Sequence, residues 1–163
     1  MRCQQNDLSA FELIYRQYEQ PLLNAGLRML GKKEDAEDAI QLAFMKLFRG
    51  LKNFKFQAKL STYLFRIMFN VCFDLIEKRK RHATRDLDGI ERGFSPTTDL
   101  RLQLEDAIST LPDRMRACFV LFAVEGVKQE EIAEMLELSV GAVKSHVFQA
   151  KRKLRAIMAE SNA

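Results

Sequence analysis

Apolar residues recur along this chain at the spacing of α-helices, and no stretch alternates apolar and polar residues as a half-buried strand does. In the segment 34–49, for example, an apolar stripe lies between an acidic first turn and a basic last turn that suit the helix dipole, and it consists of Ile40, Phe44, Leu47 and Phe48. Only seven glycines and three prolines interrupt the pattern. The sequence therefore predicts an all-α fold of long helices, in which Ser9 begins the first helix and Pro21 kinks or breaks it.

The helical pattern fades between residues 82 and 99, where Gly89, Gly93 and Pro96 gather. The chain has 163 residues, 47% of them apolar, which is enough for two small cores. We predict two small helical domains, residues 1–81 and 100–163, joined by a flexible linker over 82–99. Fully extended, that linker reaches about 60 Å, or about 17 base pairs of duplex, so the two domains can contact separate sites on one DNA.

Composition excludes several classes of protein. No apolar run approaches the ~20 residues that would cross a bilayer, and the first ten residues carry no secretory signal, so we expect a cytoplasmic protein without membrane insertion. The three cysteines are widely spaced, which argues against a disulfide framework or a zinc site, and we expect Cys72 and Cys118 to be reduced core thiols. A net charge of +4 permits nucleic-acid binding without demanding it. We expect no metal and no cofactor.

The most specific local pattern is a helix-turn-helix over residues 128–155. Its first helix presents Ile132, Ala133 and Leu136 to the second, and the turn 137–139 ends in Ser139, a good N-cap for the next helix. In the second helix one face is apolar, through Val143, Val147, Ala150 and Leu154. The opposite face is therefore free to enter a DNA major groove.

The residues on this opposite face suit DNA recognition. Gly141 lets the backbone approach a phosphate, Lys144 and Ser145 can donate hydrogen bonds to base edges, and Phe148 can pack on a thymine methyl. Lys151 and Arg152 add charge that neutralises phosphates. The alternative is a plain helical hairpin with a solvated basic face.

A second group of residues, in the first domain, combines aromatic rings with positive charge. Single-strand binding needs rings on which bases stack and cations that attract the backbone, and an amide can read the edge of an extruded base. The residues of this group are Phe54, Lys55, Lys59, Tyr63, Asn70, Lys78 and Arg79. The alternative is structural: rings in a core, a basic helix end that complements the dipole, and an Asn70 that bonds within the bundle.

Three segments together resemble a known family. DAEDAIQLAFMKLFRGL, AKLSTYLFRIMFNVCFDLIEKRKR and LPDRMRACFVLFAVEGVKQEEIAEMLELSVGAVKSHVFQAKRKL closely resemble regions 2 and 4 of the extracytoplasmic-function (ECF) sigma factors, in the same order. The resemblance covers nearly the whole chain outside the linker and the termini. It implies a sigma factor that directs core RNA polymerase to specific promoters and initiates transcription, with promoter DNA, core polymerase and an anti-sigma factor as partners.

The resemblance also implies residue roles. The helix with Asp35, Asp38 and Gln41 would bind the clamp helices of core polymerase. Phe54, Tyr63 and Asn70 would open the −10 element and hold an extruded base, and the helix from Ser139 would read the −35 element.

The chain departs from the family pattern at three positions. Leu42, on the polymerase-binding helix, stands where the family usually has Glu. Lys128 replaces the usual Ser cap of the first helix-turn-helix helix, and Gln149 replaces an Arg expected to contact DNA. These changes bear on one polymerase contact, one helix cap and one DNA contact.

Two other classes of function remain to be weighed. A helix-turn-helix regulator that acts without polymerase would also bind duplex DNA, but it needs no strand-opening domain. An enzyme needs a catalytic group, and the only histidines, His82 and His146, sit in no nucleophile or metal-ligand pattern. We therefore predict no catalytic residues, no small-molecule substrate and no enzymatic activity.

Overall fold

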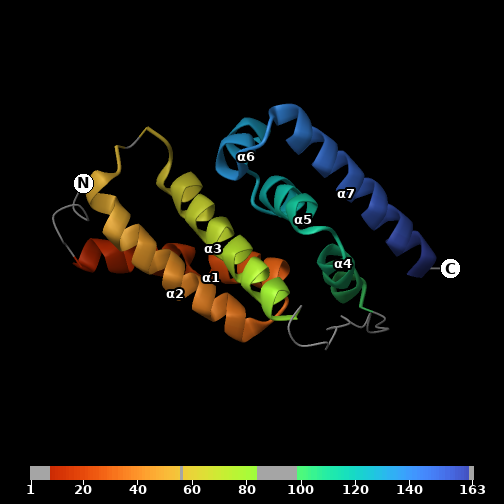
Figure 1. Cartoon of the computed structure of the whole chain (residues 1–163), viewed down its shortest axis with the longest axis horizontal. Helices are drawn as coiled ribbons and strands as arrows, with labels where there is room; N and C mark the ends of the chain where they lie inside the picture. Colours follow the sequence, from red (N-terminus) through yellow and green to blue (C-terminus); the bar gives the residue numbers. More distant parts are fainter. Residues whose placement is uncertain (1–7, 56, 84–98, 162–163) are drawn as a thin grey trace. The chain divides into compact units, whose positions relative to one another are not determined.

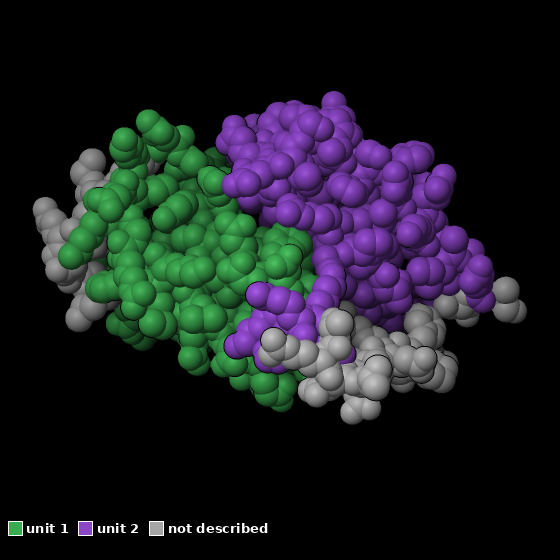
Figure 2. Space-filling model, viewed as in Figure 1, with its two compact units in different colours: residues 1–77 green, residues 78–163 purple. Residues whose placement is uncertain are grey.

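The computed structural model describes residues 8–55, 57–83 and 99–161. Every regular element within these ranges is a helix, which confirms the all-α prediction (Figure 1). The chain divides into two compact units, residues 1–77 and 78–163 (Figure 2). Most of the predicted linker, residues 84–98, lies outside the described residues.

The first unit contains α1 (Leu8–Leu30), α2 (Lys33–Gly50), the short 3₁₀ helix η2 (Leu51–Asn53) and most of α3 (Leu60–Ala83). Its core is made of fully buried side chains from all three α-helices, among them Leu22, Met29, Leu47, Leu64, Met68 and Phe69. Gly26 on α1 allows close packing, because a Cβ there would lie 2.7 Å from Met68 Cε and 3.2 Å from Ala36 Cβ. The bundle therefore brings α1 close to both other helices.

The prediction that Pro21 would kink or break the first helix was wrong about the break, since α1 continues from Leu8 to Leu30 with Pro21 inside it. Ser9 likewise lies within the first turn and not ahead of it. A proline removes one helical hydrogen bond. Leu22 and Ala25, both fully buried beyond the proline, anchor the helix in the core and offset that loss.

The second unit contains α4 (Leu100–Ser109), α5 (Asp113–Phe119), the π-helix η3 (Val120–Val124), α6 (Gln129–Leu136) and α7 (Val140–Ser161). Asp99 caps α4 by accepting a 2.9 Å hydrogen bond from Arg101 N. The long α7 packs against α4, α5 and α6 (Figure 1). It is therefore the helix around which the unit is built.

The two described cysteines, Cys72 and Cys118, are buried thiols outside any disulfide, as predicted. Burial away from water raises the pKa of the Cys118 thiol to about 11. This thiol stays neutral at physiological pH and acts as a small apolar side chain.

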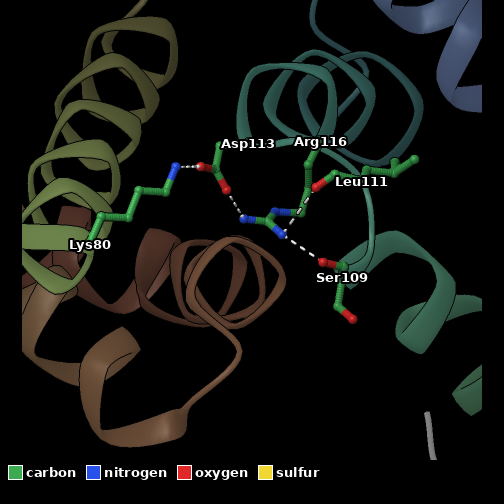
Figure 3. A network of polar contacts seen from close by, with 5 residues as sticks. All are labelled: Lys80, Ser109, Leu111, Asp113 and Arg116. Carbon is green, nitrogen blue, oxygen red and sulfur yellow. Dashed lines mark hydrogen bonds and ion pairs between the residues drawn. The ribbon is translucent and has the colours of Figure 1, made fainter. Parts of the chain in front are cut away.

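The corner between α4 and α5 is built around a buried positive charge, Arg116 (Figure 3). Its Nη1 donates to the carbonyl oxygens of Ser109 at 2.8 Å and Leu111 at 3.4 Å, and its Nη2 donates to Asp113 Oδ1 at 2.7 Å. The second oxygen of Asp113 accepts a 2.6 Å hydrogen bond from Lys80, which also belongs to the second unit. The guanidinium thus joins the end of α4 to the start of α5.

Candidate nucleic-acid interface

The helix-turn-helix consists of α6, a three-residue turn and α7, as predicted. Glu137 adopts the left-handed conformation (φ 55°, ψ 46°) that ends α6, and Leu138 N donates to Ala133 O at 2.9 Å. Ser139 Oγ then accepts a 3.0 Å hydrogen bond from Ala142 N, which confirms it as the cap of α7. Lys128, at the cap position of α6, makes no side-chain capping bond.

The two faces of α7 differ as the sequence predicts. The apolar residues Val143, Val147, Ala150 and Leu154 are all buried. The predicted DNA-contact residues are exposed: Ser139, Gly141, Lys144, Ser145, Phe148, Gln149, Lys151 and Arg152. Phe148 leaves 67% of its surface in water. An aromatic ring so exposed contributes little to the core and is available to a binding partner.

Besides Ser139, three of the exposed residues have contacts within the unit. Gln149 Nε2 donates to Ser145 Oγ at 3.1 Å, so these two side chains are linked before any DNA arrives. Lys151 Nζ lies 5.1 Å from the centre of the Phe122 ring, a cation–π contact. Phe122 was not singled out from the sequence, because it sits on η3, a separate element that only the fold brings to α7.

Arg114 on α5 is another residue that sequence reasoning missed. Its Nη1 donates a 2.8 Å hydrogen bond to Leu136 O, the last residue of α6. A cation there satisfies a carbonyl that the helix leaves without an intrahelical partner. Arg114 therefore fixes the entry to the turn of the helix-turn-helix.

In the first unit, Phe54 and Tyr63 stack on each other, with ring centroids 4.8 Å apart and an interplanar angle of 29°. Phe54 follows η2, where its N–H donates to Leu51 O at 3.2 Å, and Tyr63 N donates to Lys59 O at 3.1 Å in the first turn of α3. Local backbone turns thus set both rings, which are half-buried. We call this pair the aromatic stack.

The remaining predicted residues of this group lie on or beside α3. Lys55, Lys59, Asn70 and Lys78 are exposed, whereas Arg79 is half-buried and its Nη2 atom is shielded from water. Asn70 follows Tyr63 by two helical turns, so it lies on the same face about 10 Å further along the axis. The aromatic rings, the amide and the lysines thus lie between residues 54 and 78 of the sequence, and Arg79 is less accessible than the lysines.

On α2 the predicted polymerase-binding residues lie away from the core. Asp38, Gln41 and Leu42 are exposed and Asp35 is half-buried. Met45, which was not singled out from the sequence, is also an exposed large apolar residue of this helix, 52% accessible against 41% for Leu42. Because the two lie three residues apart on a helix, they are neighbours on its surface. An acidic and amide-bearing face therefore continues into an apolar one.

Two helical units, of which one carries a helix-turn-helix with an exposed recognition face, define a DNA-binding protein. The profile of sigma-70 region 2 matches residues 14–82, and that of sigma-70 region 4 matches residues 101–154. The chain is 30% identical to the ECF RNA polymerase sigma factor SigM of Mycobacterium tuberculosis, across 96% of this chain and 81% of that protein. The RNA polymerase sigma-H factor of Pseudomonas aeruginosa is 28% identical, across 94% and 88%.

Solved structures agree with these relatives. A structure of CnrH in complex with the cytosolic domain of CnrY is 26% identical in sequence and superposes with a TM-score of 0.76, covering 98% of this chain and 94% of CnrH. The sigma factor RpoE from Bartonella quintana, solved with the anti-sigma factor NepR, is 24% identical and shares the fold, with a TM-score of 0.81 over 92% of this chain and 97% of that one.

The chain belongs to the sigma-70 family, and within it to the ECF RNA polymerase sigma factors. A regulator that works without polymerase is not favoured, because both sigma regions are present. The family consists of regulatory DNA-binding proteins. Within the described ranges, no helix is both long and apolar enough to span a bilayer.

Proposed function

We propose that the two units of this sigma factor divide promoter recognition between them. The first unit binds core polymerase through α2 and opens the −10 element beside the aromatic stack, and the second reads the −35 element with the exposed face of α7. One observation carries the proposal: two aromatic rings that stack on each other lie in one unit, and a capped helix-turn-helix with an exposed polar and basic face lies in the other.

Core binding rests on the surface of α2. Its buried residues, Ala36, Ala39, Ile40, Ala43, Phe44 and Leu47, hold the helix against the bundle. The opposite side presents Asp38 and Gln41 beside Leu42 and Met45. A polar rim around apolar residues is typical of protein–protein interfaces. Leu42 thus replaces a polar contact by an apolar one that Met45 extends.

Asp38→Arg is expected to weaken binding to core polymerase by about tenfold or more. Placing a charge of the wrong sign at a complementary interface costs several kcal/mol, and about 1.4 kcal/mol corresponds to a factor of ten in affinity. Affinity for core polymerase, measured by fluorescence anisotropy without DNA, checks it. Glu12→Arg, on the exposed side of α1, makes the same charge change elsewhere and should bind normally. Equal affinities of Asp38→Arg and the wild type for core polymerase would show that α2 does not form the interface.

Strand opening rests on the aromatic stack with Asn70. Extruding a base costs a few kcal/mol, and stacking on a ring returns about 1–3 kcal/mol per base. The exposed amide of Asn70 offers both donors and an acceptor to a base edge. Lys55, Lys59 and Lys78 would attract the phosphates of the opened strand, with Arg79 beside them.

Duplex reading rests on α7, where base contacts and phosphate contacts should separate experimentally. Lys144→Ala is expected to cost about 1–3 kcal/mol on the cognate −35 element and to relax preference at one base pair. Arg152→Ala should weaken all sequences alike and lower the slope of log K against log salt by about one. Binding to a randomised −35 duplex at several salt concentrations checks both. If Lys144→Ala kept the base preference and only flattened the salt dependence, Lys144 would contact phosphate and would not read a base.

Partners and location follow from the same proposal. CnrH, which is 26% identical to this chain, was solved with the cytosolic domain of CnrY, so we infer that this chain also binds a protein partner. The resemblance to the ECF sigma factors implies that this partner is an anti-sigma factor. Because the proposed function requires promoter DNA and polymerase, we infer that the protein acts in the cytoplasm. The chain acts by binding alone and supplies no catalytic group of its own.

A further inference from the structure

Gly50, the last residue of α2, has no backbone reason to be glycine. Its φ of −81° and ψ of −21° lie in the ordinary right-handed helical region, which every residue adopts. Glycine is less favourable than alanine in helices, so the residue at this position works against the helix it ends. An explanation must therefore come from the space around Gly50.

That space is filled by Tyr63. A Cβ on Gly50 would lie 2.5 Å from the Tyr63 hydroxyl oxygen, closer than atoms pack, but 3.6 Å from Cζ and 3.9 Å from Cε1 of the same ring. The last two distances are ordinary van der Waals contacts. Only the hydroxyl oxygen is thus in conflict with a side chain at position 50, and the same tyrosine ring stacks on Phe54.

We propose that Gly50 is a positioning residue for strand opening: the absence of a side chain leaves the space in which the Tyr63 hydroxyl fits while the ring stacks on Phe54. The inference rests on the proposed role of the aromatic stack and adds to it the residue that sets its geometry. A base can stack on this pair only if the two rings keep their stacked arrangement, because aromatic rings placed differently meet offset or edge-on. A methyl group at position 50 moves the ring and misaligns the stack.

The test is a cycle of four proteins: the wild type, Gly50→Ala, Tyr63→Phe and the double variant. Nuclear Overhauser contacts between the rings of residues 54 and 63 are recorded on the free chain. Gly50→Ala should lose these contacts and keep its thermal stability, because alanine suits the helix end. In the Tyr63→Phe background, where the conflicting oxygen is gone, adding Gly50→Ala should leave the ring contacts intact.

Open-complex formation with core polymerase, followed by permanganate reactivity of unpaired thymines, should show the same pattern. Gly50→Ala should reduce the rate about tenfold when Tyr63 is present, a loss within the range of one stacked base. In the Tyr63→Phe background the same change should matter less than about twofold. A loss of similar size in both backgrounds, or unaltered ring contacts in Gly50→Ala, would overturn the proposal.

The two proposals fail in different ways. Tyr63→Ala removes the stack itself, so open complexes that form at the wild-type rate with this variant would refute the strand-opening role. The ring contacts of the free protein are measured without DNA or polymerase. They therefore test the effect of Gly50 on Tyr63 whatever the outcome with promoters.

Discussion

Arg116→Ala is expected to destabilise the second unit by about 3–5 kcal/mol, the usual cost of breaking a buried ion pair. The Arg116 side chain is 3% exposed, and its Asp113 partner is 27% exposed. The substitution also leaves the carbonyls of Ser109 and Leu111 without this donor. Because a small domain has only about 5–15 kcal/mol of stability, the loss is a large fraction of the free energy that keeps the unit folded.

Thermal unfolding by circular dichroism checks this expectation, with a fall in melting temperature of about 12–40 °C for a domain of this size. Hydrogen exchange should place the loss of protection in residues 99–161 and spare the first unit. Arg152→Ala provides the matched control, since Arg152 is an exposed arginine of the same unit. Equal melting temperatures for Arg116→Ala and Arg152→Ala would show that the buried network adds no stability.

Asp113→Ala distinguishes charge from packing. It leaves the Arg116 charge buried without its carboxylate, so it should destabilise by at least about 2 kcal/mol. Replacing both residues, as Asp113→Ala with Arg116→Met, removes the buried charge and keeps most of the volume. The double variant should therefore be more stable than Asp113→Ala alone, and a strictly additive double variant would contradict the pairing.

Asn70→Ala is expected to reduce open-complex formation about tenfold to a hundredfold, the equivalent of roughly 1–3 kcal/mol of lost base contact. Asn70 is exposed on α3, so its loss should leave the thermal stability and the closed complex unchanged. Permanganate footprinting of unpaired thymines measures the opening directly. Ser161→Ala, at the C-terminal end of α7, should open the promoter normally.

A promoter already mismatched at −10 separates opening from holding. Mismatches remove the cost of unpairing, so they should restore part of the activity of Asn70→Ala. The remaining deficit reports the missing contact to the base. Full restoration would assign Asn70 to unpairing alone, whereas normal footprints on the matched promoter would leave it with a structural role only.

Sequence reasoning performed best where the signals are local. The cap of α7 by Ser139, the turn before it and the buried stripe from Val143 to Leu154 all follow from residues close in the chain. Pro21 shows the opposite case, because the packing of Leu22 and Ala25 overrides a local helix breaker. Local patterns specify elements, and tertiary contacts decide how far an element extends.

Several contacts that sequence reasoning missed join separate elements. DRMRACF reads as a helix with solvated charges, and only the α4–α5 corner turns Arg116 inward. Phe54 and Tyr63 were both identified, but their stacking depends on the turn of η2 and the start of α3. Gly50 gave no signal of its contact with Tyr63, since a glycine at a helix end usually marks the end of the helix and not a neighbour's hydroxyl.

The most direct test of the whole account is transcription in vitro with this chain, core RNA polymerase and a library of promoters randomised at −35 and −10. We predict that transcripts depend on adding the chain, and that the transcribed templates share one duplex element near −35 and one opened element near −10. The Lys144→Ala chain should change only the −35 preference, and the Asn70→Ala chain only the −10 element. DNA binding by the chain without any stimulation of core polymerase would contradict the account.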